Sequence, residues 1–409
     1  IQYLAKNNKY DIIITEIGGT VGDIESLPYI EALRQMKWEM GEKNVAAIHL
    51  TLIPYLSAAK ELKTKPTQHS VKELRSIGIQ PDVLVCRSDR AIPANERAKI
   101  ALFTNVEEKA VISLKDVSSI YQIPSILKNQ GLDDLVCRRF YLNCPEANLA
   151  EWEQVLYQES NPTSEVTIGM VGKYIELQDA YKSILEGFIH AGAMNEVKVN
   201  VVNVHSEAIT QENVKELVGG LDGLLVAPGF GNRGIEGKIV AVQYARENNL
   251  PFFGICLGMQ MAVIEFARNV IGLKGAHSVE MDPSSPEPVI NMMEEQKRIT
   301  MMGGTMRLGS YPCTITENTL AHKIYGTTNI NERHRHRYEF NNAYLNDFHE
   351  KGMVTSGVNP ATGLVEIVEL PNHPFFIGVQ YHPELKSTVE APAPLFVHFI
   401  AAAKAYAKK

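Results

Sequence analysis

One short segment constrains the fold of this chain more than any other: Gly254-Ile255-Cys256-Leu257-Gly258-Met259-Gln260. It follows an apolar run at 250–253 that has the length of a buried strand, and the next residues, 261–268, have the pattern of a helix. A nucleophile on a sharp turn between strand and helix, with glycine two positions before and after it, is typical of the nucleophile elbow of hydrolytic enzymes. The helix N-terminus behind the sulfur of Cys256 favours the thiolate. The alternative is a small buried cysteine without chemistry, so the elbow by itself leaves both interpretations open.

A histidine and a glutamate at the end of another apolar run, 375–379, favour the catalytic interpretation. His382 and Glu384 are two residues apart, and residues i and i+2 of an extended segment point to the same side. Pro383 between them is expected to exclude a helix. Glu384 can then orient the imidazole of His382, and His382 can take the proton from Cys256, as in covalent catalysis. Because both motifs lie at strand ends, the sequence predicts a Cys-His-Glu triad.

The composition limits the class of protein. The chain has 409 residues, 45% of them apolar, which suits a globular protein of roughly two or three domains. Its net charge of −7 argues against a general nucleic-acid binder. The five cysteines show no Cys-x-x-Cys spacing, which indicates a reduced cytoplasmic protein without disulfides or a zinc site. No apolar run of ~18 residues and no signal peptide are visible, so no membrane association is expected. Because the chain starts at Ile1, without methionine, we expect that an upstream portion is missing.

Apolar runs alternate with helical segments in the first part of the chain. Strands are predicted at 44–54, 82–86 and 110–114, and the segment 26–40 has a helical pattern. The run 10–16 is expected to form the first buried strand. This alternation predicts a parallel sheet that is covered on both sides.

A polar, proline-broken stretch at 146–164 is the best candidate for a linker. New strands are predicted beyond it at 166–172, 197–202 and 223–227. The predicted fold is therefore α/β, with two domains that are each a largely parallel sheet with helices on both faces. The predicted boundaries are 1–145 for the first domain, 146–164 for the linker and 165–409 for the second domain.

Two segments of the first domain have compositions that suit a nucleotide. Glu16 ends its predicted strand and is followed by the glycine-rich segment 17–25, which is where parallel sheets place ligands. Its carboxylate could hold Mg²⁺ beside phosphates, or it could be a capping acid in a tight turn. The segment 60–70, rich in lysine and threonine around Pro66, is predicted to be a loop. It could donate hydrogen bonds to a polyphosphate or could be an ordinary solvated loop.

Three features of the second domain suit chemistry at a thiol. The backbone N–H groups of Gly229 and Leu257 are natural donors to an oxyanion. The arginine-rich segment 332–338 could bind a substrate carboxylate or could be a solvated strand. Glu280 could meet a substrate ammonium, although its position in the sequence alone does not select it. Gly237-Lys238 is not a P-loop, because the glycine spacing is wrong and a hydrophobic residue replaces the Ser or Thr.

The elbow and the later His-Pro-Glu resemble the class I glutamine amidotransferases, and the whole chain resembles the CTP synthase family. The segments that carry the second resemblance are Gly18-Gly19-Thr20-Val21-Gly22-Asp23-Ile24-Glu25, Lys63-Thr64-Lys65-Pro66-Thr67-Gln68-His69-Ser70, Val171-Gly172-Lys173-Tyr174-Ile175-Glu176-Leu177 and Arg333-His334-Arg335-His336-Arg337-Tyr338-Glu339. The resemblance implies a flavodoxin-like glutaminase that releases ammonia from glutamine through a cysteinyl thioester. It also implies a P-loop-type synthetase domain that uses ATP and Mg²⁺ to phosphorylate UTP, which the ammonia converts to CTP.

The resemblance carries site residues to this chain position by position. The triad would be Cys256, His382 and Glu384. The glutamine contacts would be Gly229, Leu257, Gly258, Met259, Gln260, Glu280 and Arg337. The contacts for UTP or CTP would be Asp23, Ile24, Glu25, Lys63, Thr64, Lys65, Pro66, Thr67, Gln68 and Lys99. The residues near ATP would be Lys115, Asp116 and Val117, and the Mg²⁺ ligand would be Glu16.

The resemblance further implies CTP as a feedback inhibitor, GTP as an allosteric activator, a homotetramer and a cytoplasmic location. The family's N-terminal P-loop segment is absent here, so we expect only the glutaminase half to be complete. Pro228 stands where many members have glycine and cannot donate an N–H, so Gly229 must supply that donor. The alternatives are a catalytically silent nucleotide-sensing or assembly module, and an amidotransferase of the GMP synthetase type. The segment 63–70 and the C-terminal place of the glutaminase disfavour the GMP synthetase type.

Overall fold

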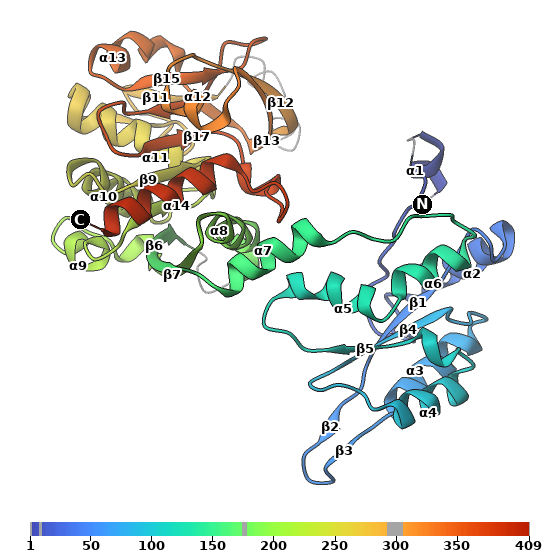
Figure 1. Cartoon of the computed structure of the whole chain (residues 1–409). Helices are drawn as coiled ribbons and strands as arrows, with labels where there is room; N and C mark the ends of the chain where they lie inside the picture. The colour runs from blue at the N-terminus through green and yellow to red at the C-terminus, as the bar shows by residue number, and fades with distance from the viewer. Residues whose placement is uncertain (1, 8–9, 174–177, 293–305, 409) are drawn as a thin grey trace. The chain divides into compact units, whose positions relative to one another are not determined.

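The chain divides into two compact units, Ile1–Ala150 and Glu151–Lys409 (Figure 1). The computed structural model describes residues 2–7, 10–173, 178–292 and 306–408. The prediction of an α/β fold with largely parallel sheets is confirmed in both units.

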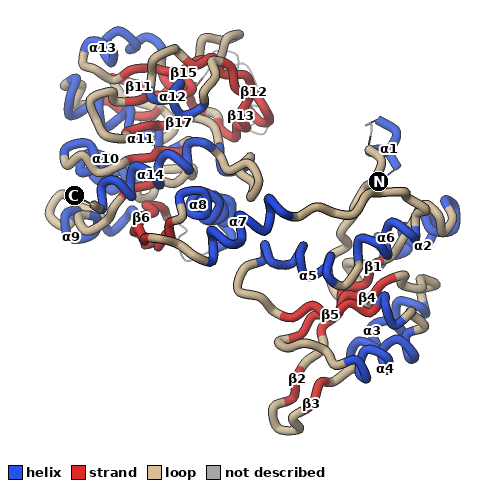
Figure 2. Tube along the Cα trace, in the orientation of Figure 1, coloured by secondary structure: helices blue, strands red, loops and turns tan. Residues whose placement is uncertain are grey.

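The first unit contains a small parallel sheet with helices around it (Figure 2). Its central strand, β4, pairs with β1 on one side and β5 on the other, and both pairs are parallel. The strands are β1 Ile48–Leu52, β4 Val83–Ser88 and β5 Val111–Lys115, and a separate hairpin joins β2 Tyr55–Leu56 to β3 Glu61–Leu62. The helices are α1 Gln2–Asn7, α2 Leu27–Met40, α3 Lys65–Ser76, α4 Ala94–Thr104, α5 Ile123–Asn129 and α6 Leu132–Arg139.

Two local predictions for the first unit are wrong. The run 10–16 is not a strand, and Ile12 and Ile14 are 56% and 93% exposed. An extended apolar run becomes a strand only when a neighbour completes its hydrogen bonds, and no other described residue pairs with this run.

The segment 60–70 is not a loop, because α3 begins within it at Lys65. Pro66 lies in the first turn of that helix, where a missing N–H costs nothing, so it starts the helix and does not break it.

The second unit is built on one sheet of nine strands in the order β13-β12-β15-β16-β17-β9-β8-β6-β7. The strands from β17 to β7 are parallel, as predicted, and those from β13 to β16 form an antiparallel extension that the sequence did not predict. The strands of this sheet are β6 Ser164–Gly172, β7 Val197–His205, β8 Gly223–Val226, β9 Phe252–Ile255, β12 Arg307–Ile315, β13 Asn329–His336, β15 Val354–Val358, β16 Val365–Glu369 and β17 Phe376–Val379.

A smaller sheet and eight helices complete the described part of the second unit. The smaller sheet consists of β10 Ala276–Ser278, β11 Glu287–Met292 and β14 Tyr338–Phe340. The helices are α7 Ala150–Ser160, α8 Lys182–Asn195, α9 Val214–Val218, α10 Ile235–Glu247, α11 Leu257–Phe266, α12 Leu320–Tyr325, α13 Leu345–Glu350 and α14 Pro394–Ala407.

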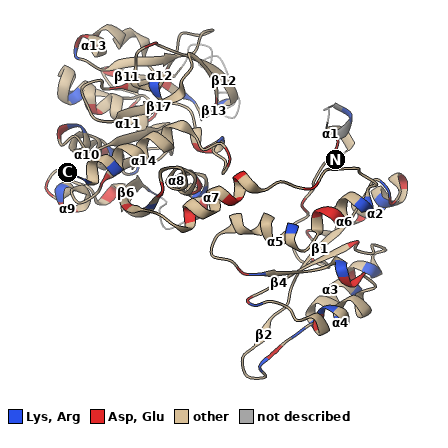
Figure 3. Cartoon of the chain, in the orientation of Figure 1, with Lys and Arg blue, Asp and Glu red and all other residues tan. Residues whose placement is uncertain are grey.

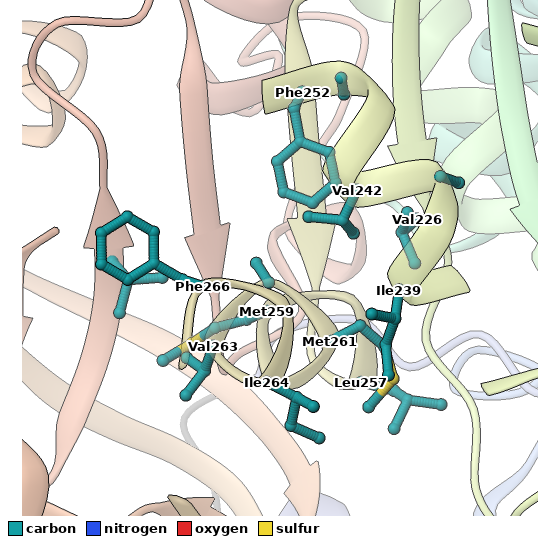
Figure 4. Packing of buried hydrophobic residues seen from close by; sticks show 14 of the residues in the cluster. Val226, Ile239, Val242, Phe252, Leu257, Met259, Met261, Val263, Ile264 and Phe266 are labelled. Atoms are coloured by element: carbon teal, nitrogen blue, oxygen red, sulfur yellow. The ribbon is translucent and has the colours of Figure 1, made fainter. Parts of the chain in front are cut away.

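Two hydrophobic clusters cover the two faces of the central sheet. Successive residues of one strand alternate between faces, and Phe252 belongs to one cluster whereas Phe253 belongs to the other. The first cluster contains α10 and α11, and the second contains α8 and α14. Figure 4 shows the first cluster, in which Leu257 and Met261 of α11 lie near Ile239 of α10. Helix α11 is buried along its whole length, which fixes the position of its N-terminus in the unit.

The charges, the helices and the cysteines of the described residues can be compared with the composition. Charged residues of both signs are interspersed in each unit (Figure 3). Among the described residues, no helix is long and apolar enough to cross a membrane. All five cysteines lie in the described part of the chain and are free thiols.

Candidate active site

Cys256 lies on the sharp turn between β9 and α11, as the sequence predicts. Its φ of 52° and ψ of −101° form a backbone conformation that residues other than glycine rarely adopt. The turn also needs two glycines, because a Cβ on Gly254 would lie 2.7 Å from the carbonyl carbon of Gly258 and one on Gly258 would lie 2.2 Å from the oxygen of Val226. The N–H of Cys256 donates to the carbonyl of Val379 at 2.7 Å. The strand end that carries the thiol is therefore tied to the strand end that precedes His382.

His382 and Glu384 are paired, but not in the way that the sequence suggested. Nδ1 of His382 lies 2.7 Å from Oε1 of Glu384. The prediction of an extended segment is wrong, because Pro383–Leu385 forms one 3₁₀ turn with His382 at its N-terminus. Proline suits the first position of a helical turn, so Pro383 allows the turn that we expected it to exclude. The N–H of His382 donates to the carbonyl of Arg333 at 2.8 Å, which holds the segment against β13.

The pKa of His382 is determined by burial and by its two neighbours, Cys256 and Glu384. Burial lowers the pKa of the imidazole, but the negative charge of Cys256 and the hydrogen bond that Glu384 accepts outweigh it and raise the pKa to about 10. Nε2 of His382 is buried and has no hydrogen-bond partner of normal geometry among the described residues. Nδ1 is thus oriented by the carboxylate of Glu384, and Nε2 is available to exchange a proton with the thiol of Cys256.

Two glutamines line the buried side of the thiol. Nε2 of Gln380 lies 3.6 Å from Sγ of Cys256, and its Oε1 accepts from Nε2 of Gln260 at 3.2 Å. Gln260 also donates to the carbonyl of Tyr338 at 2.9 Å, so its amide is engaged within the protein. We did not predict Gln380, although it lies two residues before His382 in the same short segment. The side chains of Leu257 and Met259 are buried in the hydrophobic cluster around α11.

The loop 227–231 passes beside the thiol and is held from several sides. A Cβ on Gly229 would lie 3.6 Å from Cδ2 of Leu257, so Gly229 is adjacent to the residue that follows the thiol. The N–H of Gly231 donates to Oε1 of Glu280 at 2.9 Å. Nζ of Lys238 donates to the carbonyl of Ala227 at 2.8 Å, and Lys173 donates to the carbonyl of Phe230. The structure thus brings together Gly229, Leu257 and Glu280, which lie far apart in the sequence.

Arg337 and Glu280 lie near the same tyrosine. Burial raises the pKa of Tyr338, Glu280 raises it further, and Arg337 lowers it. Nε of Arg337 is buried and has no hydrogen-bond partner in the described part of the chain. A cation and a carboxylate therefore both act on Tyr338, and the carboxylate also binds the loop 227–231. Such a pair suits the two charged groups of an α-amino acid.

Strand β13 alternates strictly between exposed and buried side chains. Arg333 and Arg335 are exposed, whereas His334 and His336 are buried and lie 2.9 Å apart between Nδ1 and Nε2. Burial lowers the pKa of His334 to about 3, so this imidazole is neutral. The face of β13 with Arg333 and Arg335 is thus solvated and cationic, whereas the face with His334 and His336 belongs to the interior. Neither a carboxylate-binding segment nor a solvated strand describes the whole segment.

A buried ionic cluster adjoins the same strand. Arg307 of β12 contacts Glu366 at 2.7 Å and Glu339 at 3.3 Å. Burial raises the pKa of Glu366 to about 7 and that of Glu339 to about 8, against the opposing effect of Arg307. No sequence motif pointed to this cluster, because its members come from three strands.

The candidate nucleotide residues of the first unit lie on α3 and α4, in the segments before α2 and α3, and at the end of β5. Thr64 caps α3, and Thr67 is buried with its hydroxyl 3.0 Å from that of Thr51 on β1. Lys115 ends β5, and Asp116 pairs with Arg87 at 2.8 Å. Further members of this set are exposed or half-buried on α3, in the segment just before it or on α4: Lys63, Lys65, Pro66, Gln68 and Lys99.

The remaining candidates of the first unit lie in irregular structure before α2. Asp23, Ile24 and Glu25 are exposed, and Oδ2 of Asp23 accepts from the N–H of Thr20 at 3.2 Å. Glu16 is also exposed and does not end a strand, so the position that we predicted for it is wrong. Among the described residues, no group of three or more His, Cys, Asp or Glu side chains could hold a metal ion. Positions 174–177, part of a segment that carries the family resemblance, lie outside the described residues.

Comparisons with known proteins identify the family. Residues 1–142 match the family model described as CTP synthase N-terminus, and residues 176–402 match the one described as glutamine amidotransferase class-I. The CTP synthase of Flavobacterium johnsoniae is 61% identical over 406 residues, which cover 98% of this chain and 75% of that protein. The CTP synthase of Cytophaga hutchinsonii is 60% identical over 409 residues, which cover 100% of this chain and 76% of that protein.

A solved structure is also similar to the second unit. It is the glutaminase domain of Trypanosoma brucei CTPS with bound acivicin, 41% identical, with a TM-score of 0.56. The similarity covers 59% of this chain and 94% of that chain.

Proposed function

The chain belongs to the CTP synthase family of glutamine-hydrolysing ligases, and we propose that it releases ammonia from glutamine through Cys256, His382 and Glu384. The observation that carries the proposal is the imidazole of His382, which has Glu384 on one nitrogen and the charge of Cys256 acting on it. A thiol, a base and an orienting carboxylate in this order are what covalent amide hydrolysis requires.

The hydrolysis proceeds in two steps. His382 takes the thiol proton as the sulfur of Cys256 attacks the side-chain amide carbon of glutamine, and the N–H groups of Gly229 and Leu257 stabilise the oxyanion that forms. His382 delivers a proton to the leaving nitrogen, so that ammonia departs and a thioester remains. Water then attacks the thioester with His382 as the base, and glutamate leaves as the thiol is restored. Glu384 keeps the imidazole in one tautomer and stabilises its charged form.

The charged groups of the substrate determine the remaining contacts. In this proposal Glu280 accepts from the α-ammonium of glutamine, and Arg337 binds its α-carboxylate. The backbone of Gly258, Met259 and Gln260 completes this binding region. The proposal is supported by the carboxylate of Glu280, which accepts from Gly231 of the loop 227–231, and by Nε of Arg337, which has no hydrogen-bond partner among the described residues.

The synthetase half of the proposal rests on the first unit and its family. Members of the family use ATP, and we propose that UTP is aminated here to CTP, which also acts as a feedback inhibitor, with GTP as an activator. Lys115, Asp116 and Val117 would contact ATP, and Glu16 would hold Mg²⁺, whose charge would offset that of the phosphates. The residues for UTP or CTP would be Asp23, Ile24, Glu25, Lys63, Thr64, Lys65, Pro66, Thr67, Gln68 and Lys99. We further propose domains at 1–145 and 165–409 and a homotetramer.

The test is glutamate release from glutamine by the purified chain. The wild type should release glutamate, and Cys256→Ala should reduce the rate by at least about 10³-fold, because the variant lacks the nucleophile. Cys313→Ala removes another buried cysteine of the same unit and should keep the wild-type rate. In the full-length enzyme, Cys256→Ala should keep CTP formation from ATP, UTP and added ammonia at the wild-type rate. Wild-type glutamate release that survives in Cys256→Ala would refute the thiol mechanism, and no release by the wild type would favour a nucleotide-sensing module without turnover.

A further inference from the structure

We propose that Lys238 is a positioning residue for glutamine hydrolysis, which holds the loop 227–231 in place and offsets negative charge beside Cys256. The inference rests on the proposed glutaminase function. It concerns a side chain that no sequence motif pointed to.

Lys238 is fully buried, which is rare for lysine. It lies in the first turn of α10 and has 0% of its surface exposed. Its Nζ donates to the carbonyl of Ala227 at 2.8 Å. Burying an ammonium costs free energy, and a methionine of similar length could fill the same space without that cost. The lysine therefore supplies a bond and a charge that an apolar side chain would not.

The helix that carries Lys238 is held rigidly at this point. A Cβ on Gly237 would lie 1.8 Å from the backbone oxygen of Ser206, so the first turn of α10 rests directly on the backbone of 206–208. Other residues of α10, including Ile239 and Val242, pack into the cluster around α11 (Figure 4). Because the helix is fixed from both directions, the ammonium is fixed as well.

The bond from Lys238 fixes the part of the loop that lies beside the thiol. Ala227 follows β8 directly and precedes Gly229 by two residues. A Cβ on Gly229 would lie 3.9 Å from Nζ of Lys238 and 3.6 Å from Cδ2 of Leu257, so these two side chains flank Gly229. Glu280 holds the far end of the loop at Gly231. The two donors proposed for the oxyanion thus belong to segments that Lys238 and α11 hold together.

The charge of Lys238 is coupled to that of Cys256. Burial lowers the pKa of Lys238 to about 7, Lys173 lowers it further, and Cys256 raises it. Negative charge on the sulfur or on the oxyanion and the positive charge of Lys238 attract each other, and this attraction acts on both groups. Lys173 is a cation that acts on Lys238, and Arg233, Glu280 and Glu207 act on Lys173 in turn.

This arrangement predicts an effect on the rate and not on substrate binding. The oxyanion forms only after attack by the sulfur, and a group that stabilises it or positions its donors lowers the barrier without changing ground-state affinity. Lys238 also lies behind the loop, bonded to Ala227, and has no surface through which to contact glutamine.

The test compares Lys238→Met with Val242→Ala, a control that truncates a buried side chain one turn later on the same helix. For each, we would measure kcat and KM for glutamate release, the rate of alkylation of Cys256 by iodoacetamide at pH 7, and the thermal midpoint. We expect Lys238→Met to lower kcat by about 10- to 100-fold, to change KM by less than about threefold and to slow alkylation. Val242→Ala should lower the midpoint while kcat stays within about twofold.

A second variant keeps the inference testable if Lys238→Met does not fold. Lys238→Gln keeps a donor but loses the charge, and we expect a fall in kcat of at least about fivefold with an unchanged KM. A folded variant with wild-type kcat and alkylation rate would overturn the inference, as would a loss that matches that of Val242→Ala. If the wild type itself releases no glutamate, the proposed function fails and this inference fails with it. A wild type that is active and depends on Cys256, beside a fully active Lys238→Met, would remove only the role of Lys238.

Discussion

The imidazole of His382 takes its properties from two neighbours. Burial alone would lower its pKa, as it does for His334, whereas Cys256 and Glu384 raise the pKa to about 10. The spacing in the sequence predicted that Glu384 would reach the imidazole, but the reason was wrong, because a 3₁₀ turn and not an extended segment brings the carboxylate to Nδ1.

At this scale we predict the effect of Glu384→Gln. The amide keeps the size of the side chain but removes a negative charge, so the pKa of His382 should fall below its wild-type value. The wrong tautomer then becomes accessible, and we expect kcat for glutamate release to fall by about 10²-fold or more. Glutamate release and an NMR titration of the imidazole would measure the two effects. Glu390→Gln, the same change at an exposed position nearby, should have neither effect, and an unchanged kcat in Glu384→Gln would contradict the role of the carboxylate.

A cluster of buried charged side chains joins two strands of the antiparallel extension to one strand of the smaller sheet. Arg307 of β12 reaches Glu339 of β14 and Glu366 of β16, and the three side chains are almost fully buried. One cation contacts two carboxylates, so a single positive charge cannot balance both negative charges, and protonation of one carboxylate is favoured. Burial raises the pKa of Glu339 to about 8, with Glu366 contributing and Arg307 opposing.

The cluster predicts a pH dependence of stability that Glu339→Gln should remove. Between the ordinary pKa of 4.5 and about 8, the folded protein keeps a proton on Glu339 that the unfolded chain releases. The contribution of Glu339 to the free energy of unfolding therefore falls as pH rises through this window, by as much as about 1.4 kcal/mol per pH unit. Urea unfolding at pH 5 to 8 should show Glu339→Gln gaining stability relative to the wild type as pH rises. Glu350→Gln, at an exposed position, should show no such trend, and a difference between wild type and Glu339→Gln that does not change with pH would count against the raised pKa.

The whole chain contains two units that each have a core. The hydrophobic clusters of the first unit draw on residues from 17 to 135, and those of the second unit on residues from 166 to 406. A ligand that binds only one unit should therefore stabilise that unit alone.

We predict two calorimetric transitions that respond to different ligands. UTP with Mg²⁺, at about 100 times its dissociation constant, adds about 2.7 kcal/mol to the unit that binds it and should raise one transition by about 5 °C or more. Glutamine, added to Cys256→Ala so that it is not hydrolysed, should raise the other. Lys65→Ala should weaken the response to UTP and leave the response to glutamine unchanged. Two transitions that both ligands raise equally would contradict separate sites.

The sequence by itself determined the features that depend on neighbouring residues along the chain. The elbow at Cys256 follows from two glycines and a strand-to-helix change of pattern, and the parallel strands follow from apolar runs that alternate with helices. These predictions hold because backbone conformation and hydrophobic periodicity are local properties.

Only the tertiary structure decided which side chains are buried, paired and charged. The run 10–16 looked like a strand but pairs with no other described residue, and Lys238, whose burial the sequence did not predict, lies fully buried beneath the loop beside the thiol. Gln380 reaches Cys256 across 124 residues, and Arg307 reaches Glu366 across 59. Burial and pKa depend on the surfaces that distant segments bring together, and no local pattern in the sequence records which surfaces will meet.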